Sequence, residues 1–251
     1  ARLRPFVCVG LAYFLVGVIV PSVWLHLRGE KGEWTATGII WSVAGGALGA
    51  IGALGIILAF TFGGRPIYVM PLVFGGAPVV NAFLTIYLAG KMREISPWFL
   101  AGLIMVTLGA VTVLVTAPHA AASNAPVAEG LWSWVWRLAA IALAIGSWGS
   151  YGPVLHKGQA AMYHSRLRSL ICVGAAYFII AVIVPYFFLG EMGEASSYLR
   201  LGTFWALLAG AFGAIGALGI ILAFNFGGRP VYVMPLVFGG APVINVLTTL
   251  A

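Results

Sequence analysis

Charged side chains are scarce in this chain, and aspartate is absent altogether. Of its 251 residues, 62% are hydrophobic and only 8% are charged, whereas soluble domains carry about 25% charged residues. A chain with so little charge cannot cover a surface that faces water. The composition therefore predicts an integral membrane protein, with the lipid bilayer as its first partner.

Acidic residues are too few for most catalytic chemistry. All six are glutamates, and each lies between apolar runs: Glu30, Glu33, Glu94, Glu129, Glu191 and Glu194. No carboxylate pair and no nucleophile–base set falls inside a span, so we expect no enzyme. Ion-coupled carriers commonly use an intramembrane carboxylate. Any transport is therefore expected to be facilitated or by exchange, unless further helices supply that group.

Cysteine is also scarce. Cys8 and Cys172 each lie inside an apolar run, and the chain has no CxxC and no His/Cys cluster at metal spacing. We expect two buried thiols, with no disulfide, no metal and no cofactor.

The net charge of +7 comes from Lys and Arg in loops that flank spans, so it indicates no nucleic-acid partner.

Eight apolar runs are long enough to cross a bilayer, for which a helix needs about 20 residues. They are roughly Pro5–Leu27, Gly38–Phe62, Ile67–Ala89, Pro97–Thr116, Leu131–Leu155, Leu170–Leu189, Leu201–Phe226 and Val231–Ala251. The alternation typical of a membrane barrel is absent, so the expected fold class is all-α. The sequence FGGRP, at 62–66 and again at 226–230, predicts tight turns between spans. Residues 118–130 are polar and form the expected linker.

One segment occurs twice. Residues 1–87 align with residues 165–251 without a gap, at a constant offset of 164, and about 50 of the 87 positions are identical. Five spans separate the start of one copy from the start of the other. An odd number places the second copy upside down in the membrane. We therefore predict inverted-topology repeats related by a pseudo-two-fold axis in the membrane plane.

The repeat predicts a ten-helix protein. Residues 1–117 correspond to helices two to five of a five-helix unit, and residues 131–251 to helices one to four of the next unit. One further helix is expected before Ala1 and one after Ala251. Lys and Arg are more numerous on one side of the spans than on the other, and that side is predicted to be cytoplasmic. We expect the protein in a bacterial inner membrane.

Ten helices in two inverted halves is the plan of the drug/metabolite transporter superfamily, and two segments resemble it. GSWGSYGPVLHKG (146–158) resembles the Trp-Gly-Ser opening of its first helix. RPIYVMPLVFGGAPVVNAF (65–83) and its copy at 229–245 resemble its fourth helix, with Pro78 and Pro242 at the matching proline. The chain is most similar to the EamA-like and glucose/ribose-type porters. The resemblance implies alternating access to a central cavity, although the two halves are more alike here than is usual in that superfamily.

Polar and aromatic side chains inside the spans are the candidates for a substrate cavity. Asn81 and Asn245 are amides at equivalent positions, and a buried amide needs either a cavity or a partner helix. The other candidates are Met70, Met234, Phe74, Phe238, Trp41, Trp205, Tyr13, Tyr177, Trp148 and Tyr151. Aromatic belts at the membrane surface are the competing interpretation of the Trp and Tyr residues.

Proline and glycine inside the spans are candidates for hinges, because Pro removes a helical hydrogen bond and Gly lets the backbone bend. The candidates are Pro71, Gly75, Gly76 and Pro78, with their copies Pro235, Gly239, Gly240 and Pro242. A static kink is the competing interpretation. Glycines such as Gly49, Gly52, Gly213 and Gly216 are expected to serve close helix packing.

These features predict a transporter of a small polar organic solute, such as a sugar, that works by alternating access between inverted halves. The alternative is a non-transporting accessory or scaffold subunit of a larger membrane complex. A homodimer is also open. A water-filled cavity that reaches Asn81 and Asn245 favours the transporter, and a sealed apolar core favours the scaffold.

Overall fold

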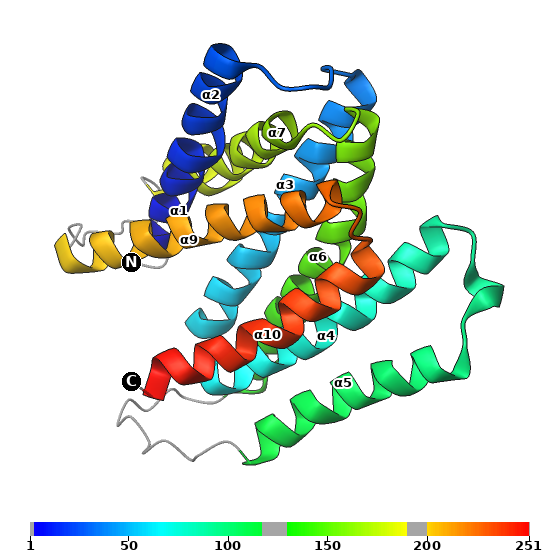
Figure 1. The fold of residues 1–251 in the computed structure, drawn as a ribbon. Coiled ribbons are helices and arrows are strands. Elements are labelled where there is room, and N and C mark those ends of the chain that lie inside the picture. The colour runs from blue at the N-terminus through cyan, green and yellow to red at the C-terminus, as the bar shows by residue number, and fades with distance from the viewer. Residues whose placement is uncertain (1–2, 117–129, 190–199, 251) are drawn as a thin grey trace.

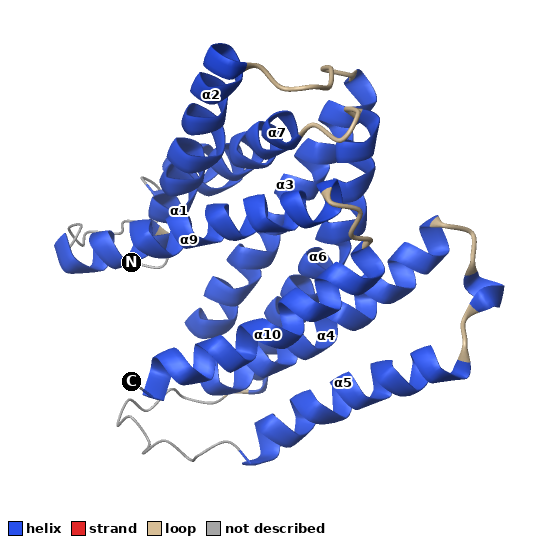
Figure 2. Ribbon diagram, in the orientation of Figure 1, coloured by secondary structure: helices blue, strands red, loops and turns tan. Residues whose placement is uncertain are grey.

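The computed structural model describes residues 3–116, 130–189 and 200–250, without the side chains of residues 94, 110, 113, 114, 116, 188, 189 and 245–250. Helices make up all of the regular structure in this part of the chain, which contains no strand (Figures 1 and 2). The predicted all-α class is therefore confirmed. The linker expected at 118–130 lies outside the described residues, apart from Gly130.

Six helical segments are long and apolar enough to cross a membrane. They are Arg4–Arg28, Ala36–Thr61, Pro66–Leu88, Leu131–Ala161, Arg166–Phe187 and Arg200–Asn225. Two further apolar helices are shorter than these spans when only their fully described residues are counted. They are Pro97–Gly109 and Pro230–Ile244. Six of the eight predicted spans are thus confirmed by length and composition, and the protein is an integral membrane protein.

The helices are numbered in chain order, and several share one span. They are α1 (Arg4–Phe14), α2 (Val20–Arg28), α3 (Ala36–Thr61), α4 (Pro66–Leu88), α5 (Pro97–Thr116), α6 (Leu131–Ala161), α7 (Arg166–Phe178), α8 (Val184–Leu189), α9 (Arg200–Asn225) and α10 (Pro230–Leu250). A short 3-10 turn, Met92–Glu94, precedes α5. Helices α4 and α10 run side by side, and α5 lies beside α4 at the edge of the molecule (Figure 1).

A wide turn interrupts the same place in both copies of the repeat. A π-helical turn at Leu15–Ile19 joins α1 to α2, and an equivalent one at Ile179–Ile183 joins α7 to α8. Each is followed by a proline, Pro21 or Pro185. Proline cannot donate a backbone hydrogen bond and its ring crowds the preceding turn. The wider turn gives the ring space without ending the helix.

The FGGRP turns form as the sequence predicts. Gly63 and Gly227 have φ of 82° and 89°, a left-handed conformation that glycine adopts without strain. The next glycine in each turn, Gly64 or Gly228, donates its N–H back into the preceding helix, at 2.8 Å in both cases. Pro66 and Pro230 then begin the following helices. Glycine after the end of one helix and proline in the first turn of the next are typical of a turn between two helices.

The two copies of the repeat pack against each other through equivalent residues. A Cβ added to Gly46 would lie 2.7 Å from the Cα of Val173, and one added to Gly210 would lie 2.7 Å from the Cα of Val9. These two contacts are related by the 164-residue offset. Helix α3 therefore packs on α7 as α9 packs on α1. Small residues permit this close approach in both places.

Helix α6 breaks this equivalence. It packs along α3, where a Cβ at Gly52 would run into Trp148 and one at Gly55 would lie 2.8 Å from the carbonyl oxygen of Ala140. The equivalent glycines of α9, Gly216 and Gly219, have no atom of the described residues within 4 Å of such a Cβ. The same sequence thus meets a partner helix on α3 and open space on α9.

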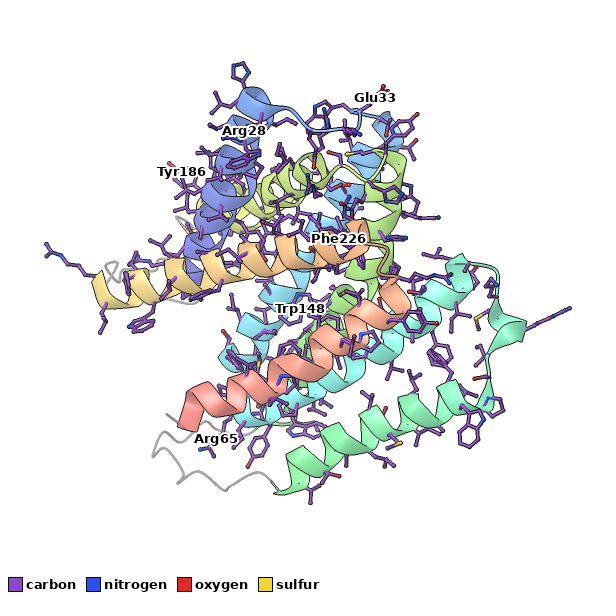
Figure 3. The ribbon with its side chains drawn as sticks, in the orientation of Figure 1. Arg28, Glu33, Arg65, Trp148, Tyr186 and Phe226 are labelled. Atoms are coloured by element: carbon purple, nitrogen blue, oxygen red, sulfur yellow. The ribbon has the colours of Figure 1, made fainter. Side chains whose placement is uncertain are left out.

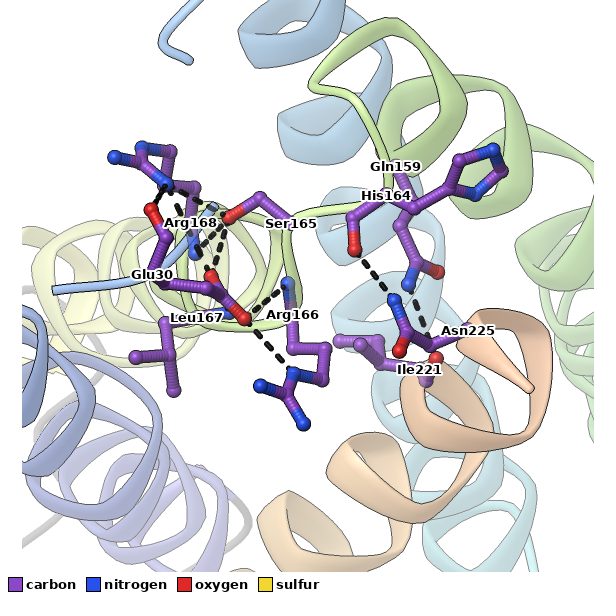
Figure 4. Close-up of polar contacts among 9 residues, drawn as sticks. All are labelled: Glu30, Gln159, His164, Ser165, Arg166, Leu167, Arg168, Ile221 and Asn225. Carbon is purple, nitrogen blue, oxygen red and sulfur yellow. Dashed lines mark hydrogen bonds and ion pairs between the residues drawn. The ribbon is translucent and has the colours of Figure 1, made fainter. Parts of the chain in front are cut away.

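A polar junction joins the end of α2 to the beginning of α7 (Figure 4). The Glu30 carboxylate accepts hydrogen bonds from the Ser165 hydroxyl (2.6 Å) and the N–H groups of Arg166 (2.9 Å) and Leu167 (3.0 Å). It also pairs with the Arg166 side chain at 2.9 Å and the Arg168 side chain at 4.0 Å. Glu30 therefore caps α7, a helix of the other repeat, where a negative charge also complements the helix dipole.

Candidate functional site

A cavity of about 200 Å³ lies at the centre of the bundle, between the two copies of the repeat. Seven of the twelve predicted cavity residues line it: Tyr13, Tyr177, Phe74, Phe238, Trp148, Tyr151 and Met234. They come from α1, α7, α4, α10 and α6, and Trp148 lies in the middle of the molecule (Figure 3). Chain segments far apart in sequence thus converge on one hollow.

Two pairs of equivalent aromatic residues meet across this cavity. Tyr13 stacks on Tyr177 with ring centroids 3.7 Å apart, and Phe74 lies against Phe238 with centroids 6.0 Å apart. Each residue therefore contacts its own copy. The cavity therefore lies where the two copies of the repeat meet through equivalent residues.

Glycine makes room for the tyrosine pair. A Cβ at Gly49 would lie 2.9 Å from the Tyr177 ring, and a Cβ at Gly213 would lie 3.0 Å from the Tyr13 hydroxyl. Both distances are shorter than ordinary contacts in close-packed interiors. Gly213, Gly216, Ala217, Ile220 and Val237 also line the cavity. The sequence does not reveal this wall, because glycine spacing by itself predicts only close helix packing.

Trp148 forms the rigid side of the cavity. Its indole nitrogen donates a hydrogen bond to the Gly49 carbonyl oxygen at 3.0 Å. Its ring lies 5.8 Å from Phe74 and 6.3 Å from Phe238, centroid to centroid. Aromatic pairs at such separations attract one another. The indole is therefore held by one hydrogen bond and two ring contacts, and it presents an ordered aromatic surface.

Polar groups in the cavity wall are few. The side chains of Tyr13 and Tyr177 are hydrogen-bonded to each other. The Tyr151 hydroxyl is buried and has no hydrogen-bond partner among the described residues, and the residue as a whole is only 8% exposed. No charged side chain is found among the described residues that line the cavity. An unpaired buried hydroxyl is costly, so Tyr151 is the group most in need of a ligand.

Asn81 lies outside this cavity. It is fully buried, and its amide nitrogen donates to the Pro230 carbonyl oxygen at 2.9 Å. This bond joins α4 to the start of α10, which agrees with the interpretation of the amide as a bond between helices. Its copy Asn245 has a side chain outside the described residues, so its predicted role stays a prediction.

Three more predicted cavity residues lie elsewhere. Met70 packs with the apolar cluster where α4 meets α6. Trp41 holds the Lys157 ammonium group 4.6 Å from its ring centroid, in a cation–π contact. Trp205 is 59% exposed on α9. These three residues do not line the cavity. Sequence periodicity identifies which residues share a face of a helix, but not which neighbouring helix covers that face.

The candidate hinge residues all lie inside continuous helices. Pro71 and Pro78 fall within α4, and Pro235 and Pro242 within α10. Gly75 is buried, and a Cβ at Gly76 would lie 2.8 Å from Ile145 of α6. At Gly239 and Gly240 an added Cβ would meet no atom within 4 Å. The two copies of this segment therefore differ in packing. The glycines of α4 are closely surrounded, whereas those of α10 have space beside them.

Metal binding finds no support in the described part of the chain, where no three His, Cys, Asp or Glu residues gather as a ligand set. Comparison with known proteins gives no assignment: no family model matches the chain, and no match was found among curated proteins or solved structures. The cavity and the repeat are therefore the features that indicate a function.

Proposed function

We propose that this protein is a membrane transporter whose solute binds in the central cavity between the two copies of the repeat. The observation that carries the proposal is the position of the cavity at the contact between the copies, where Tyr13 meets Tyr177 and Phe74 meets Phe238. If the copies are inverted in the membrane, as the odd number of spans between them predicts, a site at this contact can face either side by exchange of equivalent contacts. The resemblance to the drug/metabolite transporter superfamily points the same way.

The cavity wall favours an uncharged solute with one apolar face. Burying an isolated ion in a low-dielectric interior costs tens of kcal/mol in the limiting case, whereas each cation–π contact returns only about 0.5–2 kcal/mol. No described lining side chain supplies a counter-charge. A desolvated ion is therefore disfavoured, and flat or ring-shaped neutral molecules fit the aromatic surface of Trp148 and the two phenylalanines.

The number of hydrogen-bonding groups sets a second limit. The wall offers the hydroxyls of Tyr151, Tyr13 and Tyr177, and the two latter groups already interact. Each solute hydroxyl left without a partner costs about 1–3 kcal/mol. Among small organic solutes, the cavity thus favours those with one or two polar groups over a fully hydroxylated sugar. We expect transport to be facilitated or by exchange, since no carboxylate is found in the described wall.

Binding to the purified full chain tests this proposal. Thermal unfolding is followed with cyclohexanol, glucose and choline as probes of three chemistries. A ligand that binds only the folded state raises stability with the logarithm of its concentration. We expect a saturable rise with cyclohexanol that Tyr151→Phe weakens, and no change in response with Tyr163→Phe, whose side chain is 67% exposed. Saturable binding of glucose or choline alone would contradict the predicted solute class.

Uptake into proteoliposomes distinguishes transport from binding alone. We expect the bound probe to exchange across the membrane faster with the protein present than in protein-free vesicles, and Tyr151→Phe to slow this exchange. Binding without exchange would support the alternative, a non-transporting subunit. That alternative has one observation in its favour: on α9, Phe212 and Ile215 are 65% and 53% exposed beside the open glycines, a surface that another membrane helix can cover.

A further inference from the structure

Two hollows follow one another along the seam between α4 and α5, away from the central cavity. The first, about 260 Å³, lies where α4 ends and where α5 and α10 begin, and its wall includes Thr85, Lys91, Ser96, Phe99, Arg229 and Tyr232. The second, about 380 Å³, lies farther along the same two helices, among Val79, Phe83, Leu100, Leu103, Ile104 and Leu108. From Ser96 to Leu108 an α-helix advances about 18 Å, more than half the thickness of a bilayer core.

The first hollow has the chemistry of an anion site. Lys91, which follows the end of α4, and Arg229, which directly precedes α10, bring two cationic side chains to it, and Ser96 and Tyr232 add hydroxyl groups. The Thr85 hydroxyl is buried there and finds no hydrogen-bond partner within the part of the chain that the structure describes. Helices α5 and α10 both begin at this hollow, at Pro97 and Pro230, and helix N-termini favour negative charge. No acidic side chain is present among the described residues of its wall.

The second hollow has the chemistry of a hydrocarbon site. Its wall is apolar except for Thr107, whose hydroxyl already donates to the Leu103 carbonyl oxygen at 3.0 Å. Helices α4 and α5 pack on one another along this seam, which leaves too little width for a helix of about 10 Å diameter. A flexible alkyl chain is much thinner, so it suits the shape of the hollow.

We propose that this groove binds one anionic phospholipid, with its phosphate at Lys91 and Arg229 and an acyl chain between α4 and α5. The anion site and the hydrocarbon site occur in the order that a lipid requires, polar at the helix ends and apolar toward the interior. A free phosphate ion would leave the second hollow empty. Both cations fall on the side of the spans that is richer in Lys and Arg, which is the side that faces anionic lipids in the cytoplasmic leaflet.

Lipid retention by the purified full chain tests the site. The protein is reconstituted in nanodiscs of phosphatidylcholine with or without phosphatidylglycerol, and the lipid that stays bound after extraction into detergent is counted by native mass spectrometry. We expect one retained phosphatidylglycerol. Each cation near an anionic surface contributes about 1 kcal/mol, so Lys91→Gln with Arg229→Gln should weaken retention about thirtyfold at 1.4 kcal/mol per factor of ten.

Two further variants make the result specific. Ile104→Trp fills the second hollow without a change of charge and should also abolish retention, whereas Arg28→Gln with Lys31→Gln removes two charges outside the groove and should leave it unchanged. The inference is overturned if the groove and control variants retain phosphatidylglycerol equally. It is also overturned if inorganic phosphate displaces the bound anion while Ile104→Trp has no effect, because the site would then bind the anion alone.

Discussion

Tyr13 and Tyr177 stack face to face, with ring centroids 3.7 Å apart and an angle of 1° between the ring planes. They are the same residue in the two copies of the repeat, 164 positions apart. Phe14 and Phe178, the next residues along, also meet, at 4.4 Å. The same position of the repeat therefore builds both halves of this contact, and added bulk behind either ring should act on the two copies alike.

The glycines behind the tyrosine pair provide the first prediction. Gly49→Ala would place a methyl group 2.9 Å from the Tyr177 ring, and Gly213→Ala would place one 3.0 Å from the Tyr13 hydroxyl. Overpacking of this kind costs about 1–3 kcal/mol. We expect both variants to lower the thermal unfolding temperature by similar amounts and to reduce the binding of the cavity probe. Gly102→Ala, with open space around it, is the matched control. Unequal effects at the two positions would contradict the equivalence of the copies.

The second prediction uses the place where the copies differ. Gly52→Ala drives a methyl group into Trp148, whereas Gly216→Ala at the equivalent position of α9 meets nothing within 4 Å. We expect Gly52→Ala to destabilise the protein by about 1–3 kcal/mol. Gly216→Ala should be neutral or slightly stabilising, because alanine favours the helix by about 1 kcal/mol. Thermal unfolding of the two variants in one detergent gives the comparison. Equal destabilisation would show that a helix also covers α9.

Much of this arrangement follows from the sequence, and the reasons differ from one feature to another. Helical spans are predictable because apolar length alone decides whether a segment can cross a bilayer. Tyr13 and Tyr177 were predictable as a cavity pair, since polar rings at equivalent positions inside spans need partners. The FGGRP turns were predictable because Gly63 must adopt a positive φ, which glycine tolerates best.

Other features depend on tertiary contacts that no local pattern contains. The repeat sequence places identical glycines on α3 and α9, yet only those of α3 are covered by α6. Asn81 was a candidate for a cavity and for an interhelical bond, and only the tertiary structure brings its amide nitrogen to the Pro230 carbonyl oxygen. Trp205 is the copy of Trp41 in the repeat, but among the described residues Lys157 lies over the ring of Trp41. The sequence therefore predicts which residues share a face of a helix, but not which helix packs against that face.

Glu30 provides the third prediction, a dependence of stability on pH. Burial of its carboxylate would raise the pKa, but hydrogen bonds from Ser165, Arg166 and Leu167 outweigh this and hold the pKa below its ordinary value. A carboxyl whose pKa is lowered on folding stabilises the protein above its unfolded-state pKa, and that contribution is lost as the pH falls through the folded-state pKa. Folding stability should therefore decline in acid below about pH 4, the ordinary range for Glu.

Glu30→Gln should remove this part of the acid response. Hydrogen bonds to charged groups contribute about 1.5–3 kcal/mol, so the variant should unfold at lower temperature at neutral pH and differ less from wild type in acid. The measurement is thermal unfolding of both proteins between pH 3 and pH 8, a range set by the pKa of Glu. Glu33→Gln, at an exposed position in the same loop, controls for loss of charge. Parallel curves for wild type and Glu30→Gln would refute the role of this junction.

Asn81 provides the fourth prediction, with the opposite dependence on pH. Its buried amide nitrogen donates to the Pro230 carbonyl oxygen at 2.9 Å, so Asn81→Asp would place an ionised carboxylate against that oxygen at neutral pH. Leaving a buried charge uncompensated costs about 3–5 kcal/mol. Protonated, the carboxyl can donate to the same oxygen. The folded protein therefore accommodates the protonated form better than the ionised form, so the stability of this variant is lost as the pH increases. We expect Asn81→Asp to unfold readily at pH 8 and to recover as the pH falls.

Asn225 offers a matched comparison for this substitution. It donates to the His164 carbonyl oxygen at 2.7 Å, as Asn81 does to Pro230, but at an exposed position. Water can solvate the carboxylate of Asn225→Asp, so its destabilisation should be small and should change little with pH. Thermal unfolding of the two variants across the same pH range separates burial from the loss of the hydrogen bond. If Asn81→Asp and Asn225→Asp behave alike, the bond from α4 to α10 is not sealed from water, and Asn81 then belongs to a wet cavity after all.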